Sequence, residues 1–416
     1  MPEQPQAGST AAPALHRRLG LPLLTFWGVG TIIGGGFYAL IGEVAGEAGL
    51  LTPLAFLVAA LIAGFSALSF AELSARLPYS AGEAHYVLEA FGRRGLSALV
   101  GWLVITTGVV SAATLANAFA RFARTLVELP SAALVIGVVV GLGVLAAWGI
   151  AESVVAAAIV TVIETCGLLL VIALAGDRLP NLPAMWSELS LDLSLASAGG
   201  VFLGAFIAFY SFVGFEDMVN LAEEVQRPAH TMPRGIVLSL AISTLIYVAV
   251  TLVVIAAVPQ RQLIESHAPL SLAVHATSPA IAGGLTLVGM LAGLNGALVQ
   301  VVMASRVAYG LARKGQAPAL LARVHPITRT PLPATALASV LVMALALFFP
   351  LATLAKITSA VLLSIYALVN LSLFQLKRRP GWGAAPGPDY PSVVPAAGFL
   401  ITLAFLLFQA ATRLVG

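Results

Sequence analysis

Two short segments contain the residue types that could bind a small molecule with one positive and one negative group. Residues 28–37 read GVGTIIGGGF, and residues 209–217 read FYSFVGFED. Each interior glycine costs an α-helix about 1 kcal/mol relative to alanine, so three in succession favour an unwound segment in the first stretch. The second stretch contains only Gly214 and predicts a weaker break. The alternative for both stretches is that small residues simply let helices pack closely.

An interrupted helix exposes main-chain groups that can bind charge. Amides are free at the start of one half-helix and carbonyls at the end of the other, and the helix dipoles add partial charges of the matching signs. We predict that the amides of residues 34–37 bind a carboxylate and that carbonyls before each break bind an amine. The predicted substrate-binding residues of the two segments are Ile32, Ile33, Gly34, Gly35, Gly36, Phe37, Phe209, Tyr210, Ser211, Val213 and Gly214.

Acidic residues inside apolar runs are the candidates for coupling transport to the movement of protons. Glu164 lies near the middle of the run 152–176, and an ionisable group at bilayer depth is a functional candidate by default. We predict that Glu164 loads and releases a proton; the alternative is a protonated acid that bonds to the backbone and has no role in transport. Glu216 and Asp217 either line the outward route or, in the case of Glu216, cap a half-helix that starts near Gly214.

The elements that must position these residues are membrane-spanning helices. The chain has 416 residues, of which 59% are hydrophobic and 9% charged, whereas soluble domains carry about a quarter charged residues. Apolar runs of roughly 20 residues fit helices rather than barrel strands. About eleven spans are predicted, at 20–45, 51–75, 95–123, 131–149, 152–176, 199–222, 235–258, 281–311, 334–350, 353–376 and 392–413. The segment 82–94 is predicted to be an interfacial start to the third span.

The distribution of Arg and Lys predicts the orientation. Of the 21 Lys and Arg residues, 14 fall at one set of predicted span ends and 6 at the other, which places the N-terminus in the cytoplasm. We expect a multi-pass protein that lies in the inner or plasma membrane. Residues 1–14 are predicted to be a disordered cytoplasmic tail. A net charge of only +3 argues against a nucleic-acid partner, and the oligomeric state stays open.

Four segments, in order along the chain, resemble the amino acid–polyamine–organocation family of transporters. They are GVGTIIGGGFY (28–38), AELSARLPYSAGEAHYVLEAFG (71–92), FYSFVGFEDMVNLAEEVQRPAHTMPRGI (209–236) and MASRVAYGLARKGQAPALLARVHPITRTPLPA (303–334). The resemblance implies an all-α integral membrane protein with a five-plus-five inverted-repeat fold and broken first and sixth helices. The repeats would be 15–176 and 199–376, followed by a loop and one additional C-terminal transmembrane helix in 377–416.

The resemblance also implies residue roles. Tyr210 would occupy an aromatic position near the substrate, and Glu216 would lie on a gating segment. Gln300 falls where relatives place a bulky pocket residue, so it joins the substrate-binding set; helix–helix hydrogen bonding is an equal alternative. The chain departs from the family in two ways. About eleven spans are predicted, whereas the family usually has twelve. Residues 161–164 read TVIE, whereas proton-coupled relatives have a lysine in place of Glu164 and resemble TVIK.

The function predicted from these features is secondary active transport of amino acids by alternating access. Proton-linked or exchange transport is favoured over sodium coupling, because residues 287–304 of the predicted span 281–311 offer no Ser or Thr hydroxyl to a sodium ion. The alternatives are a transporter of polyamines or other amines with the same fold, and a channel. No HExxH motif, GxSxG motif or Cys/His cluster lies within the spans, so an enzyme, a metal and a cofactor are not expected.

Overall fold

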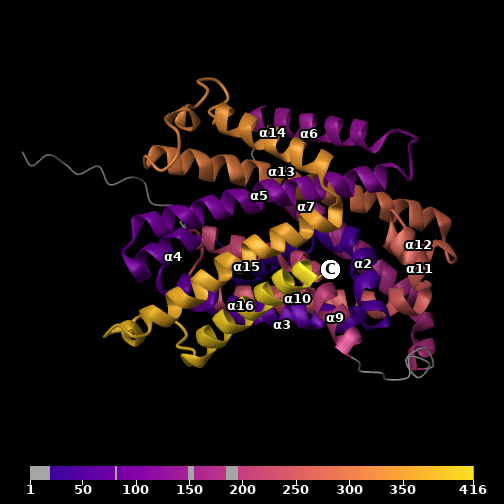
Figure 1. Cartoon of the computed structure of the whole chain (residues 1–416), viewed down its shortest axis with the longest axis horizontal. Helices are drawn as coiled ribbons and strands as arrows, with labels where there is room; N and C mark the ends of the chain where they lie inside the picture. Colours follow the sequence, from indigo (N-terminus) through magenta and orange to yellow (C-terminus); the bar gives the residue numbers. More distant parts are fainter. Residues whose placement is uncertain (1–18, 80–81, 149–153, 184–194, 416) are drawn as a thin grey trace, which may run out of the picture.

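The computed structural model describes residues 19–79, 82–148, 154–183 and 195–415, and these residues form a bundle of helices (Figure 1). Their only β pairing is an isolated bridge between Leu19 and Val225. The tail predicted for residues 1–14 lies outside the described residues.

The helices follow the predicted spans closely. The first half contains α1 (Leu21–Ile32), α2 (Gly35–Ala48), α3 (Thr52–Arg76), α4 (Gly82–Phe91), α5 (Arg94–Ala123), α6 (Ser131–Trp148) and α7 (Val154–Ala175). The second half contains α9 (Leu195–Ala208), α10 (Pro228–Ala257), α11 (Gln260–Glu265), α12 (Pro269–His275), α13 (Pro279–Arg313), α14 (Leu332–Phe348), α15 (Leu351–Leu376) and α16 (Val393–Val415). In the described part of the chain, nine apolar helical segments are long enough to cross a membrane, and α1 and α14 are shorter apolar helices.

Three details differ from the sequence-based expectation. The segment 82–94 is a separate helix, α4, because the chain turns at Gly92 with a φ of 66° before α5 begins. Helix α10 begins at Pro228, seven residues before the predicted start of its span. The short helices α11 and α12, of six and seven residues, were not predicted, because hydropathy windows of about 19 residues cannot resolve them.

Two long helix pairs organise the bundle. Helix α5 runs along α13, and α3 runs along α10, while α6 and α14 lie against each other on the far side of the α5–α13 pair. In Figure 1, α4 lies at one end of the bundle and α11 with α12 at the opposite end. We call these the α4 end and the α11 end.

The first and sixth spans are both interrupted. Helix α1 ends at Ile32 and α2 begins at Gly35, so the first break is two residues long. In the sixth span, α9 ends at Ala208 and is followed only by the 3₁₀ turns 209–212 and 216–221, with no α-helix before Pro228. Both predicted breaks are confirmed. The second is longer than its single glycine suggested.

Candidate functional site

The glycines of the first break have different surroundings. A Cβ atom at Gly35 would lie 2.7 Å from the backbone of Gly293, and one at Gly36 would lie 2.8 Å from the ring of Tyr210. These two glycines let α2 approach α13 and the sixth span, which is the close-packing role considered as an alternative. A Cβ atom at Gly34 would meet nothing within 4 Å. Gly34 therefore faces open space, while its neighbours are packed tightly.

The two breaks touch each other and share hydrogen bonds. Gly214 has a φ of 128°, which L side chains rarely adopt, and a Cβ atom there would lie 2.4 Å from the carbonyl oxygen of Thr31. The Thr31 hydroxyl donates to the Gly214 carbonyl at 3.1 Å. From α10, the Tyr247 hydroxyl is 2.8 Å from the carbonyl oxygen of Ile32 and 3.0 Å from that of Ser211. One tyrosine thus joins both interrupted helices.

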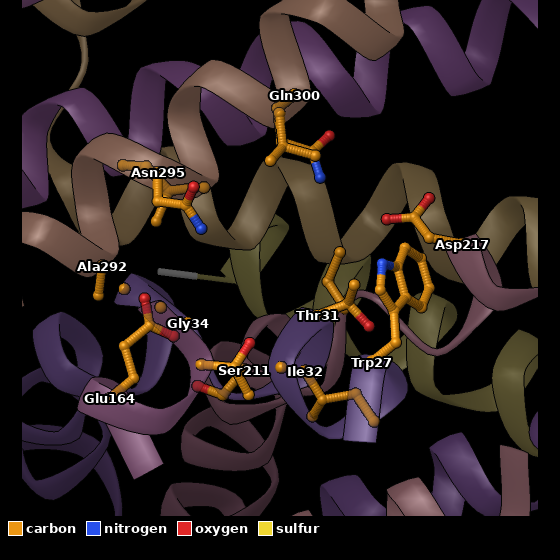
Figure 2. Close-up of a pocket in the computed structure, with 18 of the residues that line it drawn as sticks. Trp27, Thr31, Ile32, Gly34, Glu164, Ser211, Asp217, Ala292, Asn295 and Gln300 are labelled. Atoms are coloured by element: carbon orange, nitrogen blue, oxygen red, sulfur yellow. The ribbon is translucent and has the colours of Figure 1, made fainter. Parts of the chain in front are cut away.

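A cavity of about 140 Å³ opens at the breaks. A dry cavity of similar size is known to admit a benzene-sized molecule, so a small organic ligand fits here. Its lining comes from α1, the first break, the start of α2, the sixth span and facing residues of α5, α7 and α13. The lining also includes Leu19 and Leu23, so the cavity extends along α1 away from α2. Figure 2 shows Gly34, Ser211 and Ile32 around its floor, with Asn295 and Gln300 opposite.

The start of α2 is the amide-rich part of the cavity wall. Gly34, Gly35 and Gly36 all line the cavity, and the first amides of a helix have no partner within the helix. The amide of Gly34 itself donates to the Ile32 carbonyl at 3.0 Å. The Ile32 carbonyl therefore accepts from Gly34 as well as from Tyr247. The amides of the first turn of α2, rather than that of Gly34, are the available donors.

Two polar side chains of the cavity wall have buried atoms without hydrogen-bond partners. These atoms are Oε1 of Glu164 and Oγ of Ser211, and both residues line the cavity. Glu164 is only 2% exposed, and its main-chain carbonyl accepts from the Tyr38 hydroxyl. Its carboxyl group lies beside Gly34 in Figure 2. A buried polar atom without a partner is costly, so both atoms are ready to bind a ligand group or, in the case of Glu164, a proton.

Tyr210 closes the cavity on the side of α5. Its hydroxyl lies 2.8 Å from the Ser111 hydroxyl and 3.2 Å from the Ser111 carbonyl. Its ring lies against Gly36, which keeps the ring next to the first turn of α2. Tyr210 and Ser111 both line the cavity.

Five predicted site residues do not line the cavity: Gly214, which lies against the Thr31 backbone, and four that face the protein interior. Ile33 is fully buried, Phe37 stacks on Tyr247 with ring centroids 4.0 Å apart, and Phe209 packs edge-on against Tyr366. The carboxylate of Glu216 accepts from the Gly214 amide at 2.9 Å and from the Tyr366 hydroxyl at 2.7 Å. This is the geometry of a side chain that caps the second break.

Several lining residues were not among the predicted site residues. Trp27 and Thr31 come from α1, Asp217 belongs to the 3₁₀ turn 216–221 of the second break, and Asn295 comes from α13. Trp27 lies five residues before the end of α1 at Ile32, and only the three-dimensional arrangement shows that the cavity extends along α1. Asp217, one of the two acids predicted to line the outward route, lies in the cavity wall.

The charged side chains in the described part of the cavity wall have one sign. The described lining residues include the carboxylic acids Glu164 and Asp217, and none of them is Lys, Arg or His. The positive partial charge in the wall therefore comes from the amides at the start of α2.

Comparison with known proteins gives the family. The profile of the amino acid permease family matches residues 19–414. The chain belongs to this family. It is 28% identical over 435 residues to the branched-chain amino acid permease of Bacillus subtilis, an alignment that covers 96% of this chain and 90% of that protein. It is 30% identical over 398 residues to the vacuolar cationic amino acid transporter 2 of Arabidopsis thaliana, which covers 90% of this chain.

Members of this family differ in length and in the substrate that their names give. The chain spans about 62% of the length of the Arabidopsis transporter. It is also 26% identical to the methylthioribose transporter of Bacillus subtilis over 97% of its own length. These relatives are named as transporters or permeases. Their names give three kinds of cargo, namely cationic amino acids, branched-chain amino acids and methylthioribose.

Proposed function

We propose that the chain is a secondary active transporter of amino acids that works by alternating access. The observation that carries the proposal is the open face of Gly34 at the amide-rich start of α2, next to the second break, in a cavity of about 140 Å³. Amides at a helix start bind anions. This arrangement favours a substrate with a carboxylate over an amine that lacks one. The family membership supports the same reading.

The proposed architecture is a five-plus-five inverted repeat, with repeats in 15–176 and 199–376 and a loop and additional helix in 377–416. Two packing pairs support it. Helix α3 pairs with α10 and α5 pairs with α13, so the second and third spans of one half meet the second and third spans of the other. The broken spans are the first of each half. Such positions for broken helices are typical of inverted repeats.

The proposed location is the inner or plasma membrane with the N-terminus in the cytoplasm. The Arg and Lys bias supports this orientation. The α4 end would then face the cytoplasm and the α11 end the outside. Since the cavity extends along α1 to Leu19 and Leu23, the described conformation would be open toward the cytoplasm.

The proposed coupling residue is Glu164. Its buried Oε1 has no hydrogen-bond partner, and its carboxyl lies beside the start of α2 where a substrate carboxylate would bind. Two negative charges at one site repel each other, so a proton on Glu164 would accompany the substrate. Transport would then be proton-linked or, without a gradient, exchange.

Reconstitution tests the function and the coupling. Proteoliposomes of the purified chain should concentrate amino acids when an inward proton gradient is imposed. A channel would only equilibrate them. In Glu164→Gln, uptake should no longer respond to the pH gradient, while counterflow reports that the variant is folded and active. The control is Glu265→Gln, which alters a carboxylate that is 64% exposed on α11. An unchanged pH response in Glu164→Gln would rule out coupling by this residue.

A further inference from the structure

One wall of the cavity is a single face of α13. The residues of α13 that line the cavity are Ala292, Asn295, Gly296, Val299 and Gln300. Their spacing of three or four residues places them on one side of the helix. The two polar side chains on this face are Asn295 and Gln300, which lie opposite Ser211 in Figure 2. Each ends in a carboxamide, which both donates and accepts hydrogen bonds.

The protein itself does not use these two carboxamides. Both residues are half-buried, and in the described part of the chain neither side-chain amide has a hydrogen-bond partner. Gln300 packs beside α5, since a Cβ atom at Gly108 would lie 3.5 Å from its Oε1, but it forms no hydrogen bond across this contact. The polar atoms of Asn295 and Gln300 are therefore available to a ligand in the cavity.

The contact between α2 and α13 relates the two carboxamides to the start of α2. A Cβ atom at Gly35 would lie 2.7 Å from the backbone of Gly293, so the first turn of α2 touches α13 next to Ala292. Asn295 follows Ala292 by one turn, and Gln300 lies about 7.5 Å further along the helix axis at 1.5 Å per residue. A side chain that extends from the start of α2 along α13 meets Asn295 first and Gln300 next.

We propose that Asn295 and Gln300 form a subsite for a carboxamide group on the substrate side chain, so that asparagine and glutamine are the preferred cargo. This inference rests on the proposed function. A carboxamide of the ligand pairs with one of the wall through two antiparallel N–H to O hydrogen bonds. An apolar side chain displaces water from the two wall amides and leaves their polar atoms unpaired, which is costly.

The charge of the wall separates these amides from the acidic amino acids of the same shape. Glu164 and Asp217 are acids, and none of the described lining residues is Lys, Arg or His. The side-chain carboxylate of aspartate or glutamate therefore finds no cationic side chain to pair with there, whereas a neutral carboxamide needs none. The subsite selects the amide over both its apolar and its acidic analogue.

The test is competition in proteoliposomes of the full chain. Counterflow of radiolabelled L-glutamine is measured against unlabelled L-glutamine, L-methionine, L-asparagine and L-leucine. Methionine has nearly the length of glutamine, and leucine has nearly the shape of asparagine, so each pair differs mainly in the carboxamide. We expect each amide to compete at least about tenfold better than its apolar analogue. A smaller preference in either pair would overturn the subsite.

Two variants locate the selectivity. Asn295→Leu and Gln300→Met replace a carboxamide with an apolar group of similar size, and each should reduce the glutamine-to-methionine preference at least about threefold. The control is Gln262→Met, which changes an exposed carboxamide on α11 outside the cavity. If both α13 variants weaken glutamine and methionine by the same factor, or if the control reduces the preference as much, the assignment is wrong.

Counterflow with each labelled amino acid in turn separates this inference from the function on which it rests. If the wild-type chain exchanges other amino acids but neither glutamine nor asparagine, the subsite is wrong and amino acid transport stands. If no amino acid is exchanged in protein that retains its thermal unfolding transition, both fail. Should the variants not fold, the comparison of each amide with its apolar analogue in the wild-type chain still decides the matter.

Discussion

The three neighbouring glycines 34–36 have different structural roles. Gly35 and Gly36 provide space for the backbone of Gly293 and the ring of Tyr210, whereas Gly34 leaves space that the protein itself does not fill. The composition of the run predicted a break, but it could not assign these tasks, because they depend on which helix lies opposite each Cβ position. Substitution at each glycine therefore has a different expected effect.

A second single-residue feature is the buried acid of α4. Glu83 is 8% exposed and lies outside the long apolar spans. Burial raises the pKa of its carboxyl group to about 7, and the nearby negative charge of Glu216 adds to this shift. Stability that depends on a neutral Glu83 is present at low pH and is lost as the pH rises through about 7.

We therefore expect Glu83→Gln to stabilise the protein increasingly as the pH rises from 5 to 8. At pH 8 the ionisation of Glu83 lowers the free energy of unfolding of the wild type by up to about 3 kcal/mol. Glutamine cannot ionise, so the variant avoids this loss. The measurement is the thermal unfolding temperature of both proteins at each pH. Glu89→Gln on the same helix is the control, because that carboxylate is 46% exposed. A difference between variant and wild type that does not change with pH would contradict this account.

Among the elements, α2 is held in its C-terminal half by two ion pairs. Glu43 pairs with Arg121 at the end of α5 at 2.5 Å, and Glu47 pairs with Lys356 of α15 at 2.9 Å. Gln260 of α11 also donates to the Ala45 carbonyl of α2 at 2.9 Å. These contacts join α2 to α5, α15 and α11. In the proposed orientation the α11 end faces the outside, so an outward opening would separate α2 from these helices.

Removing the Glu43–Arg121 pair should therefore favour the outward-open conformation. Both side chains are about a quarter exposed, so the pair contributes about 0.5–1 kcal/mol and its loss shifts the equilibrium about two- to fivefold. The readout is labelling from outside by an impermeant thiol reagent. The reporter is Ala292→Cys, whose position lines the cavity, in a Cys166→Ser background that removes the one native cysteine. Arg121→Gln should increase labelling by that factor.

The exposed pair Arg261–Glu265 on α11 provides the control for this experiment. Its side chains are 88% and 64% exposed, and neither belongs to α2. Arg261→Gln should leave the labelling rate unchanged. If Arg121→Gln and Arg261→Gln give the same labelling as the parent protein, the pair does not hold the outer side closed.

For the whole molecule, hydropathy and charge predicted most of the fold. Every predicted span contains helical structure, because an apolar run of about 20 residues is long enough to cross a bilayer as a helix. The length of the second break could not be predicted. Its single glycine, Gly214, has a positive φ and lies against the Thr31 backbone, which is a contact between distant parts of the chain.

The site was predictable only in part, because much of it also depends on contacts between distant parts of the chain. The main-chain groups of the first break follow from local sequence. The lining by Trp27, Asp217 and Asn295 depends on how α1, the sixth span and α13 are arranged in space. The extent of the cavity along α1 therefore needed the structure.

The central claim is that a substrate carboxylate binds at the start of α2, in the space that Gly34 leaves open. Gly34 has extended dihedral angles, φ −132° and ψ −169°, that alanine also adopts, and a Cβ atom there meets no protein atom within 4 Å. Gly34→Ala should therefore fold normally while its methyl group occupies the substrate space. Gly284→Ala on α13 is the matched control, because its Cβ atom is equally unobstructed.

The decisive measurement is the affinity for the transported amino acid, from counterflow competition and from ligand-induced thermal stabilisation of the same preparations. We expect Gly34→Ala to unfold at the temperature of the wild type and to bind the amino acid at least about tenfold more weakly, while Gly284→Ala binds normally. A Gly34→Ala protein that binds and transports the amino acid as the wild type does would contradict the proposed site.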